Sequence, residues 1–189
     1  MHKERHEEML AVSARLFREK GFRATSMVDI ASEMGITKAA LYYYIESKHD
    51  LLYEICDAAT TRLLEGVREI ETQPGTPEER LARLIRWHVS MFGANGDIIK
   101  VYLADEGELP EEKREHMRGL SREFENIYRK ILQEAVKKKA FRKLDVPVTV
   151  RAISGMCNWL SIWYRPDGRL APDQIADIFI DLILKGCKY

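Results

Sequence analysis

The sequence is poor in three features that would assign it to a specialised class of protein: charge of one sign, paired cysteines and long apolar runs. Its 189 residues include 30 basic and 30 acidic side chains, so the formal net charge is zero. This balance argues against a polycationic nucleic-acid binder, and any such binding must come from the local placement of charge. No apolar run approaches the roughly 20 residues that cross a bilayer, so we expect no membrane partner.

Cysteine and histidine usage predicts neither a disulfide framework nor a metal site. The cysteines, Cys56, Cys157 and Cys187, are scattered, and their odd number argues against a set of disulfides. His2 and His6 have the spacing of a metal pair, but no third ligand accompanies them, so no metal is expected. The charged start, MHKERHEEML, does not resemble a signal peptide, and we expect a cytoplasmic protein.

Apolar residues recur at helical spacing throughout the chain, whereas the alternation typical of strands is almost absent. With 46% hydrophobic and 32% charged residues, the pattern predicts an all-α globular fold. Nine helices are expected, approximately over residues up to 20, 26–35, 37–44, 47–73, 76–92, 98–105, 110–139, 145–164 and from 172 onward. A chain break is expected at 93–97, where two glycines occur.

Several of the expected helices begin at recognisable capping residues. Ser26 with Asp29, and Ser47 with Asp50, have the spacing in which a hydroxyl and a carboxylate bind each other's backbone amides. Asp145 is expected to cap the eighth helix in a similar way.

The second and third helices are short and are joined through Gly35, which suits a tight turn because positive φ costs glycine nothing sterically. With a first helix to cover their inner faces, this arrangement is typical of a helix-turn-helix. Leu41 and Ile45 lie four residues apart and should face the core, which turns Tyr42 and Tyr43 outward. These hydroxyls suit a DNA backbone. The alternative is that the tyrosines only cover apolar surface.

The stretch GFRATSMVDIASEMGITKAALYYYIESKHDLL, from Gly21 to Leu52, resembles the DNA-binding signature of the TetR family of bacterial transcriptional regulators. One departure is Ile45, where the family usually has phenylalanine. By this resemblance the DNA-contacting positions are Thr25, Ser26, Thr37, Lys38, Ala39, Tyr42, Tyr43 and Lys48, with Ala39 close to the base edges.

The same resemblance implies a TetR-like architecture of nine helices in two domains. Residues 1–46 would form a three-helix DNA-binding domain, and residues 47–189 a helical bundle for ligand binding and dimerisation. The partners would be a double-stranded DNA operator, a small-molecule effector and a second copy of the chain, joined through the last two helices. Periodicity leads independently to the dimer, because the last two helices have more than one apolar face and a second face needs a second partner.

The stretch from Met156 to Gly186 resembles the end of a TetR subgroup that responds to fatty acyl-CoA or other acyl-CoA thioesters. Asn158, Trp159, Trp163, Tyr164 and the turn 165–168 carry this likeness. Ala171 departs from the usual serine, so a capping hydroxyl is absent there.

An acyl-CoA would need an apolar tunnel for its chain, and cations with an aromatic face for its head. Large candidates to line the tunnel are Met91, Phe92, Met117, Phe124, Tyr128 and Met156. Arg151, Arg165 and Trp159 are available for the head. The expected ligand-binding set also includes His88, Asn158 and Trp163. The alternative for each of these residues is an ordinary place in the core.

Two other functions remain open for the chain at this point. The same fold could sense a drug-like or other apolar effector in place of an acyl-CoA. A helical-bundle enzyme is disfavoured, because the sequence offers no convincing nucleophile and base, phosphate loop or metal cluster. We therefore expect a regulator without a cofactor, most simply a repressor that its ligand releases from a palindromic operator.

Overall fold

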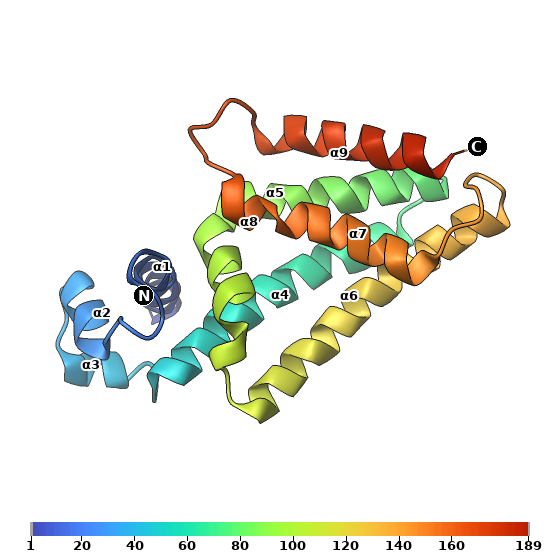
Figure 1. Ribbon diagram of the computed structural model, residues 1–189. Coiled ribbons are helices and arrows are strands. Elements are labelled where there is room, and N and C mark those ends of the chain that lie inside the picture. The colour runs from blue at the N-terminus through green and yellow to red at the C-terminus, as the bar shows by residue number, and fades with distance from the viewer. Residues whose placement is uncertain (1, 189) are drawn as a thin grey trace. The chain divides into compact units, whose positions relative to one another are not determined.

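A computed structural model describes residues 2–188, apart from the side chains of residues 2, 3, 94 and 95. Within that range the regular elements are all helical (Figure 1). They are α1 (His2–Lys20), α2 (Met27–Glu33), α3 (Lys38–Tyr42), α4 (Lys48–Thr72), α5 (Pro77–Asp105), the 3-10 turn η1 (Glu106–Glu108), α6 (Glu111–Lys137), α7 (Val146–Asn158), α8 (Leu160–Trp163) and α9 (Pro172–Cys187). The predicted all-α, nine-helix fold is confirmed. None of the described helices is both long and apolar enough to cross a membrane.

The chain forms two compact units. The first unit contains the residues up to Thr60 together with Asn95–Arg118, and the second contains Thr61–Ala94 together with the residues from Gly119 onward. Helices α4, α5 and α6 each contribute residues to both units. The domain boundary expected at residues 46 and 47 falls inside the first unit.

Helix α5 runs without interruption through the glycines at which a break was expected, so that prediction is wrong. Glycine lowers helix propensity by about 1 kcal/mol but permits helical dihedrals, and tertiary packing commonly outweighs this cost. Gly93 has a packing role, because a Cβ atom at this position would lie 2.8 Å from Cγ of Pro172 at the start of α9. The glycine therefore marks a close approach between two helices.

The predicted eighth helix is also divided, because Trp159 forms a turn between α7 and α8. Helix α3 is shorter than expected and ends at Tyr42, so that Tyr43 and Tyr44 lie in the turn that follows it.

The expected caps are confirmed. Oγ of Ser26 accepts from the Asp29 amide at 3.1 Å, and Oγ of Ser47 accepts from the Asp50 amide at the same distance. Asp145 accepts from the Val148 amide at 3.1 Å. At α9 the missing serine is partly replaced, because Oε1 of Gln174 accepts from the Ala171 amide at 2.9 Å. This contact is the carboxamide half of a capping box.

Candidate nucleic-acid interface and effector site

The turn between α2 and α3 has the geometry expected of a helix-turn-helix. Gly35 has a φ of +65°, the left-handed region that glycine adopts without strain. Thr37 caps α3 by accepting from the Ala40 amide at 3.1 Å. Leu41 and Ile45 are buried, as predicted. These contacts fix which side of the short helix faces outward.

The predicted tyrosines lie on the outward side of α3 and of the turn that follows it. Tyr42 is 43% exposed and Tyr43 is 77% exposed, and the ammonium group of Lys38 lies 5.7 Å from the centroid of the Tyr42 ring. Tyr44 is half-buried and packs edge-on against Tyr43 with ring centroids 5.6 Å apart. Ser26, Thr37 and Ala39, also predicted to contact DNA, are exposed. This face thus presents hydroxyl groups, a cation and a small residue together.

Thr25, also predicted to contact DNA, does not present its side chain on this face. The side chain is fully buried, and its hydroxyl lies 2.9 Å from the carbonyl oxygen of Gly21 and 3.3 Å from that of Leu16. The hydroxyl therefore donates to carbonyl groups at the end of α1. A buried hydroxyl without a hydrogen-bond partner would destabilise the fold.

Lys48, another predicted DNA contact, makes hydrogen bonds within the first unit. Its ammonium group donates to the carbonyl oxygens of Phe22 and Thr25 at 2.9 Å and reaches that of Arg23 at 3.4 Å. An ammonium group has three donors, and three carbonyls engage them here. A phosphate could bind Lys48 only by displacing one of these contacts.

Within the first unit, ion pairs join α1 to α5, the turn before α2 to η1, and α4 to α6. Arg18 pairs with Asp97 at 2.7 Å, Arg23 pairs with Glu108 at 2.9 Å, and Lys113 pairs with Asp50. The contacts from Lys113 and Ser47 lower the pKa of the Asp50 carboxyl. Asp50, which takes part in the cap at the start of α4, is thereby linked to α6.

The second unit brings together five of the residues predicted to bind ligand. The ring of Phe124 lies 5.2 Å from that of His88 and 4.9 Å from that of Tyr128, and Phe92 stacks on His88 at 6.5 Å. Nε2 of His88 lies 2.9 Å from Oδ1 of Asn158. Four aromatic rings and an amide therefore form one cluster, contributed by α5, α6 and α7, and we call these residues the His88 cluster.

Two polar atoms of the His88 cluster are buried without a hydrogen-bond partner. They are Nδ1 of His88 and the hydroxyl of Tyr128, both on fully buried side chains. Burial lowers the pKa of His88 to about 4, and it raises the pKa of Tyr128 well above its usual value. Both groups are therefore neutral at pH 7. An unsatisfied buried polar group costs about 1–3 kcal/mol, so a binding partner for these atoms would be stabilising.

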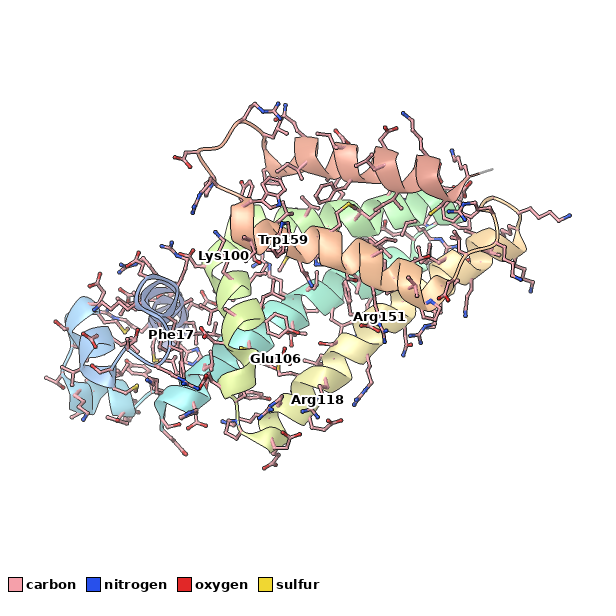
Figure 2. The ribbon with its side chains drawn as sticks, in the orientation of Figure 1. Phe17, Lys100, Glu106, Arg118, Arg151 and Trp159 are labelled. Atoms are coloured by element: carbon pink, nitrogen blue, oxygen red, sulfur yellow. The ribbon has the colours of Figure 1, made fainter. Side chains whose placement is uncertain are left out.

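The remaining predicted ligand residues do not share one environment. Met91 is buried in the second unit, Met117 is buried in the first, and Met156 is half-buried. Arg151 and Trp159, which Figure 2 labels, are exposed, Trp159 to 62%. Trp163 is 44% exposed as well. The side chains of Arg151, Trp159 and Trp163 therefore end at the surface and not in the core of the second unit.

A hollow of about 450 Å³ in the second unit lies among residues that the sequence did not single out. Its lining consists of Gly66, Glu69, Ile70, Gln73, Arg83, Arg86, Trp87, Ser90 and Asp173. Trp87 packs directly on α4, where its Nε1 donates to the Leu63 carbonyl at 3.0 Å and a Cβ at Gly66 would lie 2.1 Å from the indole. An isolated glycine within a helical pattern was the available signal for this close contact.

Large apolar side chains are exposed on the last helices. Among the described residues these include Val148, Trp159, Ile162, Trp163, Ile178 and Leu182. Most of the other exposed large apolar residues, Val28, Tyr42 and Tyr43, belong to the helix-turn-helix. Exposed apolar side chains thus gather where the sequence predicted binding to DNA and to a second subunit.

Two family models match this chain. The model described as bacterial regulatory proteins of the tetR family matches residues 9–55, and the tetracyclin repressor-like C-terminal domain matches residues 74–187. The chain belongs to the TetR family. It is a DNA-binding transcriptional regulator and not an enzyme.

Individual relatives of this TetR-family regulator match over almost its whole length. The transcriptional repressor KstR2 of Rhodococcus jostii (strain RHA1) is 29% identical over 185 residues, which cover 96% of this chain and 90% of KstR2. The crystal structure of PfmR from Thermus thermophilus has a TM-score of 0.90 at 35% identity, with 96% of this chain and 99% of PfmR covered. AibR in complex with isovaleryl coenzyme A and operator DNA has a TM-score of 0.86 at 27% identity, with 94% of this chain and 97% of AibR covered.

Proposed function

We propose that the chain acts as a homodimeric repressor, bound to a palindromic operator and released from it by a fatty acyl-CoA. The proposed class of effector rests on the His88 cluster. This cluster buries aromatic surface around polar atoms that have no hydrogen-bond partner. Support also comes from AibR, a relative with a solved complex of isovaleryl coenzyme A and operator DNA.

The proposed DNA contacts are those predicted residues whose side chains reach the surface. They are Ser26, Thr37, Lys38, Ala39, Tyr42 and Tyr43. In a dimer, two copies of α3 would enter successive major grooves roughly 34–36 Å apart. The exposed apolar side chains of α7, α8 and α9 would form the subunit interface.

The proposed effector would occupy the bundle with its acyl chain beside the His88 cluster. Arg151, Arg165 and Trp159 are exposed and could receive the phosphates and the adenine of CoA. Helix α5 continues from this cluster to Asp97, which pairs with Arg18 of α1, and α6 continues to Lys113, which pairs with Asp50 at the start of α4. A displacement of either helix on ligand binding would therefore move the DNA-binding helices. The coupling free energy between ligand binding and DNA binding is typically 1–3 kcal/mol.

Operator binding tests the DNA face. A palindromic duplex selected from a random pool is titrated by fluorescence anisotropy at several salt concentrations. Lys38→Ala should reduce the slope of log K against log salt by about 0.9, the value for one lost phosphate contact. Tyr42→Phe and Tyr43→Phe should weaken binding at every salt concentration, because each loses a hydroxyl donor. Unchanged affinity in all three variants would refute this assignment.

Calorimetry tests the effector. Decanoyl-CoA should bind the protein more tightly than decanoic acid, because only the thioester carries the phosphates and the adenine. It should also release the operator duplex. Equal affinity of the two compounds, or binding of neither, would remove the CoA proposal and favour a drug-like or other apolar effector.

A further inference from the structure

The His88 cluster contains one free hydrogen-bond acceptor and one free donor. Nε2 of His88 lies 2.9 Å from Oδ1 of Asn158, so the neutral ring carries its proton on Nε2 and leaves Nδ1 as an acceptor. The hydroxyl of Tyr128 supplies the donor. Both side chains are fully buried, and neither atom has a partner.

The rings of His88 and Tyr128 both pack against Phe124. Phe124 lies 5.2 Å from His88 and 4.9 Å from Tyr128, measured between ring centroids. Ser154 on α7, one turn before Asn158, carries a third buried polar atom without a partner, its hydroxyl oxygen. A pure hydrocarbon placed here would leave all of these atoms unsatisfied, whereas an oxygen on the ligand would pair with them.

We propose that the effector carries an oxygen in the part that enters among α5, α6 and α7, and that Tyr128 and His88 bind it. The hydroxyl of Tyr128 donates to this oxygen. If the oxygen belongs to a hydroxyl group, its proton is donated to Nδ1 of His88. The oxygen could come from a substituent on the acyl chain or from the thioester carbonyl. This inference rests on the proposed function, which supplies an acyl thioester as ligand.

The experiment compares three CoA derivatives of one chain length by calorimetry. Decyl-CoA, a thioether, has no oxygen on the chain or at the sulfur-bearing carbon. Decanoyl-CoA adds the thioester carbonyl, and β-hydroxydecanoyl-CoA adds a chain hydroxyl as well. The wild-type protein should bind at least one oxygen-bearing derivative about tenfold more tightly than decyl-CoA. The derivative at which affinity rises identifies the source of the oxygen.

Tyr128→Phe should abolish this preference, so that the three derivatives bind alike. Tyr164→Phe is the matched control. Tyr164 is buried in the same unit, but its hydroxyl is not among the buried atoms that have no partner. The Tyr164→Phe protein should therefore keep the preference for oxygen-bearing derivatives. The ligand-free Tyr128→Phe protein should melt at the wild-type temperature or above it, since the substitution removes an unpaired buried hydroxyl.

Three results would overturn the inference while leaving the proposed function intact. They are equal affinity of the wild-type protein for all three derivatives, a preference that persists in Tyr128→Phe, and a lowered melting temperature of ligand-free Tyr128→Phe. Failure of the wild-type protein to bind any of the three would instead refute the proposed function, and this inference with it.

Discussion

Lys48 and Phe22 are bound to each other in two ways across 26 positions of the chain. The ammonium group donates to the Phe22 carbonyl at 2.9 Å, and it lies 4.4 Å from the centroid of the Phe22 ring. The first residue of α4 thus holds the turn between α1 and α2, on which the position of α2 depends. Carbonyl dipoles and a ring face both favour a cation at this place.

Lys48→Met should therefore destabilise the protein, because it keeps the apolar stem and loses the donors. We expect a loss of about 1–2 kcal/mol in the free energy of unfolding, measured by urea denaturation. The salt slope of operator binding should stay at its wild-type value, whereas Lys38→Met should lower it. A slope for Lys48→Met as low as that for Lys38→Met would mean that Lys48 contacts a phosphate after all.

Gly66→Ala should destabilise the second unit, because the new methyl group would overlap the Trp87 indole. Overpacking of this kind costs typically 1–3 kcal/mol. The loss should be smaller when Gly66→Ala is combined with Trp87→Leu, and a double-mutant cycle measures this coupling. Gly155→Ala is the matched control, since nothing lies within 4 Å of a Cβ there, and it should stabilise α7 by about 0.5–1 kcal/mol. Equal effects of the two alanines would contradict the close packing.

His88 should make the stability of the protein depend on pH below neutrality. Its pKa is lowered to about 4 in the folded protein by burial, against about 6.5 in the unfolded chain. Between these values the unfolded chain binds more protons, so stability decreases as the pH falls from 6.5 and levels off below 4. The total loss would be about 3 kcal/mol.

His88→Gln keeps a polar side chain beside Asn158 and removes the titration. The difference between the wild-type and His88→Gln unfolding free energies should therefore change across this pH range and be constant above it. A difference that does not vary with pH would show that His88 has an ordinary pKa.

Leu182→Glu should separate the proposed dimer. Leu182 is 59% exposed on α9, and a carboxylate at the centre of an apolar interface would be desolvated without a partner. Sedimentation velocity should show the mass of one chain for this variant and of two chains for the wild type. Leu103→Glu, at an exposed apolar residue of α5 in the first unit, should remain a dimer. A dimeric Leu182→Glu protein would place the interface elsewhere.

The features that the sequence predicted correctly depend on neighbours within about one helical turn. Ser26, Ser47 and Asp145 each bind an amide three residues further on, so the pattern that predicts the cap contains both partners. Burial of Leu41 and Ile45 likewise follows from their spacing on one short helix.

The contacts that the sequence did not predict join residues that are far apart along the chain. Lys48 binds carbonyls 23 to 26 positions away, and Gly93 meets Pro172 from another helix. Periodicity contains no information on such long-range contacts, so it predicts a break at Gly93 and does not reveal the carbonyl contacts of Lys48.

The division of the chain into interleaved segments restricts how such a regulator can evolve. Each compact unit is assembled from two stretches that alternate along the sequence, with junctions near residues 60, 94 and 118. A single recombination event at any point within the chain would therefore give at least one unit a foreign segment. Exchange of a whole unit between regulators would require several crossovers at once. Substitution of single residues, which leaves both units intact, is therefore the more accessible route of change.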